Sequence, residues 1–281
     1  MLSSSSSKIT VNFGNVATNY AQFRNDLPDE LLESLKLRGI HFDKKKVVDL
    51  GAGTGVLTRA LHEAGAHVIG VEPSAELIEE AKQIDEKSGF SIEYVQAFAD
   101  ATSLPEQRFD LITVLRAWHW FDRQKTLAEI RRILKEDGKL LVIDSGFLKK
   151  NNVVADSIAF IKERLPDGAI KPAGTKADSK QMINSFPVEW FKEWEDHEFA
   201  LQETYKFDYI VTFSNEAWCG RLGSLSWLAN CDSKHRNQLL QDLYNLLETK
   251  YEGMVHQIEH GCYIAILQKE NRRNMTNRIN M

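Results

Sequence analysis

The fold is decided by the stretch Val47-Val48-Asp49-Leu50-Gly51-Ala52-Gly53-Thr54-Gly55. Its apolar start predicts a buried strand, and the alternating glycines after it predict a sharp turn. The residues that follow, 56–64, predict a helix that is closed by Gly65. Glycine has no Cβ, so the backbone at such a turn can lie directly against a ligand. In an open α/β sheet, nucleotides bind at the carboxyl end of the first strand.

The alternation of strands and helices continues beyond the turn. Ser74 is a suitable N-cap, and Gly138 lies where the end of a helix is expected. Such alternation predicts an α/β fold with a doubly wound, mostly parallel sheet that is covered by helices on both faces. Strands are predicted at residues 67–71, 92–95, 109–115 and 139–144, with helices after Ser74 and at 124–134.

The regular pattern ends near residue 146. Residues 147–200 mix prolines and glycines with aromatic residues, which predicts an inserted cap that forms an acceptor pocket. Beyond this insertion, the pattern predicts extended chain at 199–213, a long helix at 234–251 and a strand at 262–268. We therefore divide the chain into a disordered tail (1–11), an α/β core with an N-terminal lid (12–145), a cap insertion (146–230), the end of the core (231–270) and a basic tail (271–281).

The spacing of the glycines separates two classes of nucleotide ligand. A dinucleotide fold uses Gly-x-Gly-x-x-Gly, whereas this chain has Gly-x-Gly-x-Gly, with Val56 directly after Gly55. The tighter spacing suits S-adenosylmethionine (SAM), which has no pyrophosphate to place on the helix. Glu72 ends the second predicted strand, where a carboxylate can accept hydrogen bonds from both ribose hydroxyls. The alternative is a glycine turn that serves packing alone, with Glu72 as a solvated strand end.

Two later strand ends offer further ligand contacts. Ala99-Asp100 follows the third strand, where an acidic side chain can accept a hydrogen bond from an adenine amino group, although loops favour aspartate in any case. The stretch Leu115-Arg116-Ala117-Trp118-His119-Trp120-Phe121-Asp122 follows the fourth strand, at the edge where ligands are expected. Its aromatic residues fit a ligand site, and they fit a packed core equally well.

A family resemblance rests on two stretches around this fourth strand. Both stretches resemble the class I SAM-dependent methyltransferases. They are Phe109-Asp110-Leu111 through Asp122 and Leu127-Ala128-Glu129-Ile130-Arg131-Arg132-Ile133-Leu134-Lys135-Glu136-Asp137-Gly138-Lys139-Leu140. The resemblance is closest to the branch of small-molecule enzymes that contains trans-aconitate methyltransferase. Phe13-Gly14, Tyr20 and Phe23-Arg24 resemble the N-terminal lid of that branch. The resemblance covers residues 12–145 and implies a seven-stranded Rossmann-like sheet.

The resemblance also implies a cofactor site. It places Gly51, Gly53 and Gly55 at the methionine and ribose parts of SAM, Glu72 on the ribose, and Ala99-Asp100 at the adenine. Arg116 stands where the family has glutamine, Phe23 replaces a tyrosine, and Asn25 replaces a proline, so acceptor and lid differ from the family pattern. The full set of expected cofactor residues is Tyr20, Arg24, Asp49, Gly51, Ala52, Gly53, Gly55, Glu72, Pro73, Ala99, Asp100, Arg116 and Trp118.

The acceptor is expected to be a small molecule, either a carboxylate or another oxygen or nitrogen nucleophile. Arg116, Trp118 and His119 are the candidate acceptor-binding residues. His119 is also the candidate general base, and the alternative is a ring that is merely packed among aromatic neighbours. Arg116 could hold an anionic acceptor through its planar guanidinium, or it could pair with Asp122 or Glu72.

Composition argues against several other classes of protein. The net charge of −5 predicts no nucleic-acid partner, and the absence of a run of ~20 apolar residues predicts no membrane partner. The three cysteines predict neither disulfides nor a zinc site, and His256 and His260, read as a helical pair, lack a third ligand, so no metal is expected. The N-terminus has no apolar core of a signal peptide, so a cytoplasmic location is expected.

Two competing functions remain open from the sequence. An NAD(P)-dependent oxidoreductase would share the sheet and the acidic residue, but the glycine spacing disfavours it. A protein that binds SAM without catalysis is the other alternative, because no residue is an unambiguous nucleophile or base. The oligomeric state cannot be read from these patterns.

Overall fold

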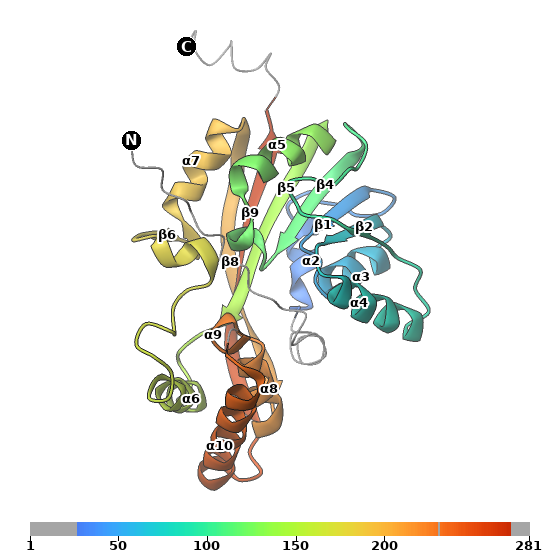
Figure 1. Ribbon diagram of the computed structural model, residues 1–281. Coiled ribbons are helices and arrows are strands. Elements are labelled where there is room, and N and C mark those ends of the chain that lie inside the picture. Colours follow the sequence, from blue (N-terminus) through green and yellow to red (C-terminus); the bar gives the residue numbers. More distant parts are fainter. Residues whose placement is uncertain (1–26, 230, 271–281) are drawn as a thin grey trace.

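The computed structural model describes residues 27–229 and 231–270, which form a seven-stranded sheet in the order β3-β2-β1-β4-β5-β9-β8 (Figure 1). The first five strands run parallel, and β9 runs antiparallel to both β5 and β8. This confirms the predicted doubly wound, mostly parallel sheet. The strands are β1 (Lys46–Leu50), β2 (His67–Glu72), β3 (Glu93–Gln96), β4 (Phe109–Leu115), β5 (Leu134–Phe147), β8 (Phe199–Phe213) and β9 (His256–Lys269).

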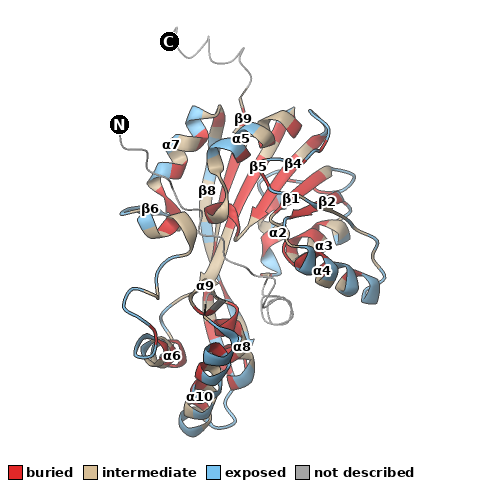
Figure 2. Cartoon of the chain, viewed as in Figure 1, coloured by how far each residue is buried: buried red, intermediate tan, exposed pale blue. Residues whose placement is uncertain are grey.

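Helices cover the sheet on both faces, because successive strand residues point to opposite sides. Val47 packs in a cluster with residues of α2 (Glu30–Lys36) and α3 (Val56–Glu63), whereas Val48 packs in a cluster with residues of α5 (Arg123–Ile133) and α7 (Val188–Asp196). Figure 2 shows the resulting buried band along the central strands. The Ser74 hydroxyl caps α4 (Ala75–Lys87), as expected, by accepting from the Leu77 amide at 3.2 Å.

The position of Gly138 differs from the expectation. Helix α5 ends at Ile133, so Gly138 lies within the extended chain of β5 and not directly after a helix. A Cβ at Gly138 would lie 2.4 Å from Cγ of Leu134. The glycine is therefore explained by this close side-chain packing and not by a left-handed helix end.

The two last strands are long and carry a helical extension beyond the sheet. Figure 1 shows α6 (Asn152–Lys162), α8 (Asn215–Gly223), α9 (Ser226–Ala229) and α10 (Ser233–Tyr251) gathered at the far ends of β8 and β9. These elements share a core of their own, built around Trp218, Leu243 and Ile258. Residues 146–230, which were predicted to form one cap insertion, therefore do not form a single unit. Helices α6 and α8 belong to the extension, whereas β8 is a strand of the main sheet.

A shorter piece of the insertion covers the carboxyl ends of β4 and β5. We name residues 171–187 the cap segment; it contains the turn η3 (Gly174–Asp178) and the small hairpin of β6 (Met182–Ile183) and β7 (Phe186–Pro187). Phe186 lies in the core cluster with Trp190 and Trp194 of α7. The cap segment is therefore anchored on the same sheet face as α5.

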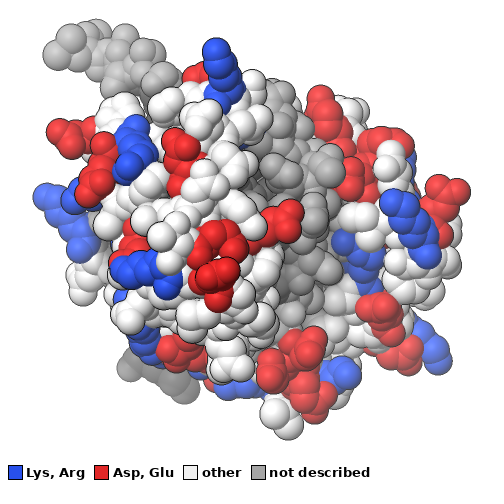
Figure 3. All heavy atoms as spheres, turned by 90° about the horizontal axis from the view of Figure 1, so that it is seen from below, with Lys and Arg blue, Asp and Glu red and all other residues white. Residues whose placement is uncertain are grey.

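The surface of the described chain carries charges of both signs (Figure 3). Positive and negative side chains are interspersed on the face shown in Figure 3. No helix in the described part of the chain is long and apolar enough to cross a membrane. The expected lid residues Tyr20 and Arg24 and the two tails lie outside the described residues.

Candidate active site

The glycine turn joins β1 to α3, and its backbone explains why glycine is needed. Gly51, Gly53 and Gly55 have φ values of 70°, 56° and 79°, in the left-handed region that other residues avoid. A Cβ at Gly51 would lie 2.6 Å from Cβ of Ala117, and one at Gly55 would lie 2.3 Å from the hydroxyl of Tyr94. Packing within the protein therefore accounts for part of the glycine pattern, as the alternative interpretation held.

Glu72 connects this turn to the end of β2. One carboxylate oxygen accepts from the amide of Gly53 and the other accepts from the amide of Ser74, each at 3.0 Å. Burial raises the pKa of Glu72, and the two amide hydrogen bonds oppose that shift. A carboxylate can accept about four hydrogen bonds, so two positions remain for the hydroxyls of a ribose. Glu72 is therefore not a solvated strand end, since only 7% of it is exposed.

Asp49 lies beneath the turn. Its two carboxylate oxygens accept from the hydroxyls of Thr58, at 2.7 Å, and Thr113, at 2.8 Å. Burial raises the pKa of Asp49 to about 6, although both hydroxyls lower it. Asp49 thus ties β1 to α3 and β4 under the glycines, and a direct contact with a cofactor stays a prediction.

The end of β3 carries the residues that are predicted to contact an adenine. Ala99 is buried in the core, Asp100 is half-buried, and the Gln96 amide donates to the Pro73 carbonyl at 3.2 Å, which ties the ends of β3 and β2 together. Phe98 is 67% exposed, the largest exposure among the aromatic residues that the structure describes as exposed. The sequence analysis passed over Phe98, because a single apolar residue in a loop gives no periodic signal.

The end of β4 turns sharply toward the cap segment. Arg116 has φ 55°, a left-handed conformation that is uncommon for a residue with a side chain, and η2 (Trp118–Trp120) follows it. Trp118 is buried against Phe121 and Trp194, at centroid distances of 6.0 and 6.3 Å. The His119 ring lies 4.9 Å from that of Trp120. Trp118 is thus a core residue that also lines the site.

Asp144 and Lys176 are site residues that the sequence analysis missed. Asp144 lies near the end of β5, and the Lys176 ammonium, which comes from η3, forms an ion pair with it. Burial alone would raise the pKa of Asp144, but the charges of Lys176, His119 and Arg116 hold it below its usual value. Asp144 could have been found from its place at a strand end, whereas Lys176 stands in a segment without periodicity.

These residues surround a hollow between the sheet edge and the cap segment. The space within it, counted together with open solvent, is about 160 Å³, and as the side chains stand it is too narrow for a water molecule. The predicted acceptor residues Arg116, Trp118 and His119 all line it. The complete lining is Arg116, Ala117, Trp118, His119, Val142, Ile143, Asp144, Lys176, Phe186 and Trp190, in which Asp144 is the one carboxylate.

The histidine pair differs from what was expected, and the charge of Arg116 lowers the pKa of Asp144. The pairing of Arg116 with Asp122 or Glu72 stays a prediction. His256 and His260 lie on strand β9 and not on a helix. They hydrogen-bond to Asn215 and to the Ile258 carbonyl, and residues 27–270, apart from 230, contain no cluster able to hold a metal.

Comparison with known proteins identifies the class. Residues 48–142 match the family model described as a methyltransferase domain. Over 142 residues the chain is 36% identical to a protein of Dictyostelium discoideum named as a methyltransferase, covering 50% of this chain and 51% of that protein. It is 27% identical over 181 residues to the uncharacterized methyltransferase YcgJ of Bacillus subtilis, covering 64% of this chain and 66% of YcgJ. The matches thus span between half and two thirds of these relatives.

A solved structure supports the fold. A Bacillus halodurans C-125 protein described as a methyltransferase aligns with a TM-score of 0.52 and 22% identity, covering 86% of this chain and 100% of that one. Residues 48–142 thus match a methyltransferase domain, and the chain has the Rossmann-like fold of methyltransferase structures, which is the fold that the sequence predicted. Its assignment to the branch of trans-aconitate methyltransferase stays a prediction.

Proposed function

We propose that this chain is a SAM-dependent methyltransferase that acts on a small-molecule acceptor. The observation that carries the proposal is the position of Glu72, whose buried carboxylate lies at the end of β2 and is joined to the Gly53 amide of the glycine turn. This arrangement fits a ligand with a ribose and no pyrophosphate. The hollow at the ends of β4 and β5 lies on the same edge of the sheet, where an acceptor would be placed.

The residues of the site bind and orient the two reactants. When bound, SAM would supply a methyl group on a cationic sulfur, so that the acceptor atom bonds to the methyl carbon as the sulfur–methyl bond breaks and its electron pair stays on sulfur. Glu72 would hold the ribose, and Ala99 and Asp100 the adenine. The buried walls formed by Trp118, Phe186 and Trp190 would exclude water and align the acceptor.

The acceptor is proposed to be a carboxylate or another oxygen or nitrogen nucleophile. A carboxylate is already an anion, so its methylation needs no general base, and Arg116 at the hollow would attract it. A hydroxyl or amine acceptor would have to lose a proton, and His119 lines the hollow where such a base is required. The three free cysteines agree with a reducing, cytoplasmic compartment.

Calorimetry tests the cofactor part of the proposal. S-adenosylhomocysteine (SAH) should bind and NADH should not, and Glu72→Ala should weaken SAH by roughly tenfold to a hundredfold, because a charge-assisted hydrogen bond contributes about 1.5–3 kcal/mol. The matched control is Glu76→Ala, an exposed carboxylate on α4, which should leave the affinity unchanged. Binding of NADH in place of SAH would show an oxidoreductase instead.

Catalysis is tested separately from binding. We expect the protein to transfer labelled methyl from SAM to at least one member of a panel of small carboxylic acids, phenols and amines. SAH release from SAM in a cell extract would show turnover when the panel lacks the acceptor. Tight SAH binding without turnover in either assay would indicate a protein that binds SAM without catalysis.

A further inference from the structure

A buried ion pair joins the cap segment to the sheet at the acceptor hollow. Lys176 is 8% exposed, and its ammonium donates to Asp144 of β5 and, at 3.2 Å, to the Ser185 hydroxyl. The same nitrogen lies 5.8 Å from the ring centroid of Trp190. Asp144, Lys176 and Trp190 all line the hollow. The pair is therefore part of the wall that an acceptor would meet.

Other contacts besides this pair hold the cap segment in place. Arg123 of α5 binds Glu193 of α7 through two hydrogen bonds, of 2.5 and 2.7 Å, and donates to the Thr175 hydroxyl at 2.7 Å. Gly174 packs so closely on η2 that a Cβ there would lie 2.2 Å from the His119 carbonyl oxygen. Buried ion pairs add little net stability, because desolvation offsets their attraction. A buried charge pair in a segment that is already fastened indicates a role in binding.

Lys176 can take one more partner. An ammonium has three N–H donors. The described residues give Lys176 two acceptors, the Asp144 carboxylate and the Ser185 hydroxyl. Lys176, His119 and Arg116 all stabilise the ionised form of Asp144, so three basic side chains surround the one carboxylate that lines the hollow. An oxyanion in the hollow would thus meet a free donor on a cation that is already fixed in position.

We propose that Lys176 is a specificity-determining residue of the acceptor site, which binds a carboxylate or similar oxyanion of a small acceptor, while Asp144 fixes the ammonium. This inference rests on the proposed methyltransferase function. It assigns the recognition of the acceptor's charge to the cap segment, in addition to any contribution of Arg116. The aromatic wall of Phe186 and Trp190 suits a flat or apolar body next to that oxyanion.

The test uses benzoate and its neutral isostere benzamide as probes of the SAH-loaded full chain. Each probe is titrated separately and followed by NMR, and the dissociation constant of the wild-type protein should be lower for benzoate than for benzamide. Lys176→Met should reduce this preference by roughly tenfold or more, because one charge-assisted hydrogen bond is lost. Lys176→Arg should retain it. Asp144→Asn should also retain it, because the amide oxygen of asparagine can still accept a hydrogen bond from the ammonium and hold it in position.

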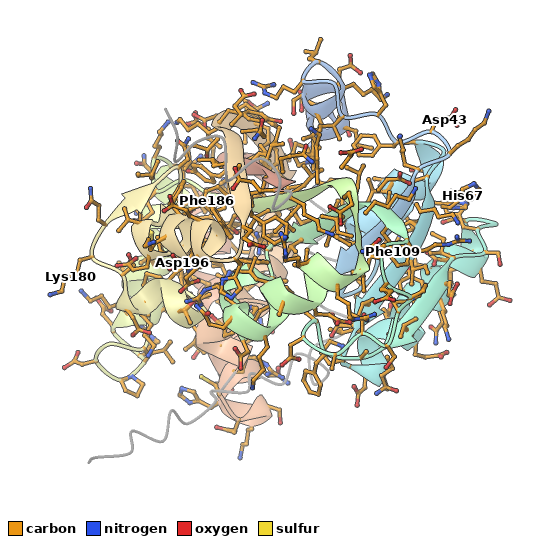
Figure 4. All side chains as sticks on the ribbon, turned by 90° about the horizontal axis from the view of Figure 1, so that it is seen from above. Asp43, His67, Phe109, Lys180, Phe186 and Asp196 are labelled. Carbon is orange, nitrogen blue, oxygen red and sulfur yellow. The ribbon has the colours of Figure 1, made fainter. Side chains whose placement is uncertain are left out.

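A matched control lies in the same segment. Lys180 is exposed and projects away from the molecule in Figure 4, whereas Phe186 lies inward among other side chains. Lys180→Met should therefore leave the preference for benzoate unchanged. SAH affinity and the melting temperature of each variant establish that it is folded.

The possible results separate the two proposals. Absence of SAH binding in the wild-type protein would overturn the proposed function. If SAH binds but the wild-type protein shows no preference for benzoate, or Lys176→Met keeps that preference, the role of Lys176 is overturned while the methyltransferase function stands. If Lys176→Met does not fold, loss of the preference in Lys176→Gln and its retention in Lys176→Arg support the proposal, and the reverse rejects it.

Discussion

The parallel half of the sheet and the helical extension differ in what organises them. Between Lys46 and Phe147, each strand ends at one edge, and the residues just beyond the ends form the site. The extension packs α6, α8 and α10 around a separate apolar core at the far ends of β8 and β9. The difference teaches that the chemistry follows from strand order, whereas the extension is organised around an apolar core that hydrogen bonds such as Trp218 to Ser157, at 3.0 Å, supplement.

The acceptor hollow lies between the ends of the parallel strands and the cap segment, and its described lining includes no residue of the helical extension. The strand ends contribute Arg116 and Asp144, and the cap segment contributes Lys176 and Phe186. The cofactor part of the site lies wholly on strand ends and the glycine turn. We therefore expect changes in the first region to affect the cofactor and changes in the extension to spare it.

The largest effect is expected at the glycine turn. Gly53→Val should abolish measurable SAH binding, because Gly53 has φ 56° and its amide donates to Glu72. A β-branched side chain is strained in that conformation and would stand where the ligand approaches. Calorimetry with SAH measures the loss.

A second glycine separates strain from ligand contact. Gly39 has φ 76°, and a Cβ there meets nothing within 4 Å. Gly39→Val should therefore carry similar backbone strain and keep its SAH affinity. Equal losses in both variants would show that Gly53 acts through stability and not at the cofactor.

The next effect tests the independence of the extension. Leu243 of α10 is fully buried in its core, and Leu243→Ala should lower the free energy of unfolding of the extension by about 2–5 kcal/mol. Hydrogen exchange should rise in α6, α8 and α10, while SAH affinity stays unchanged. The exposed Gln241 on the same helix provides the control Gln241→Ala. A matching loss of SAH affinity in Leu243→Ala would show that the two regions are coupled.

The same division explains what the sequence could predict. The bounds of β4 and β8 are those expected, and β1, α3 and α5 differ by a residue or two, because buried strands and amphipathic helices leave a periodic signal. The glycine turn and Glu72 were found because spacing and strand ends define them. Helix α6 was not predicted, since it lies in a stretch that seemed irregular from its prolines and glycines.

The parts of the site that escaped prediction depend on tertiary contacts. Lys176 reaches Asp144 because η3 folds back over the sheet edge, a contact between residues far apart in the chain. The sequence did not reveal that His256 and His260 lie on a strand. Strand β9 begins at His256, before the continuous apolar run that was predicted as a strand, so the spacing of the two histidines suggested a helix. Such contacts leave no local pattern in the sequence.

A smaller effect is expected of pH on the free energy of unfolding, and it arises from Asp49 on strand β1. Burial raises the pKa of Asp49 to about 6, so the folded chain binds a proton there more tightly than the unfolded chain, whose value is close to 3.8. The stabilisation from this proton is complete below the unfolded pKa and is lost as pH rises through about 6. Relative to Asp49→Asn, the wild-type free energy of unfolding should fall by about 3 kcal/mol across that range, at 1.36 kcal/mol per pKa unit.

Urea unfolding at a series of pH values measures this difference. Asp110→Asn provides a control of opposite sign, because burial would raise the pKa of Asp110 but the hydrogen bonds from Lys135 and the Lys46 amide lower it overall. The stability that Asp110 contributes should be lost as pH falls. A wild-type curve parallel to that of Asp49→Asn would mean that Asp49 is not a buried acid with a raised pKa.

The smallest expected effect lies at Arg116, which follows β4 and lines the acceptor hollow opposite the cap segment. Arg116→Gln restores the residue that is usual in the resembling family. It keeps a long polar side chain but removes the cation from the acceptor hollow. If Arg116 helps to bind an anionic acceptor, the KM for that acceptor should rise by roughly tenfold, since one charge-assisted hydrogen bond contributes about 1.5 kcal/mol at the lower limit. SAH affinity should change little, because Glu72 and the glycine turn are intact.

Kinetics with one anionic and one neutral acceptor decide whether Arg116 binds the charge of the acceptor or only stabilises the wall of the hollow. A loss confined to the anionic acceptor would assign Arg116 to recognition, together with Lys176. Equal losses on both acceptors would mean that Arg116 acts through the fold, since it stabilises the ionised form of Asp144 in the same wall. The double variant with Lys176→Met sharpens the result: two residues that bind the same oxyanion should show losses that do not add, whereas independent residues should show additive losses.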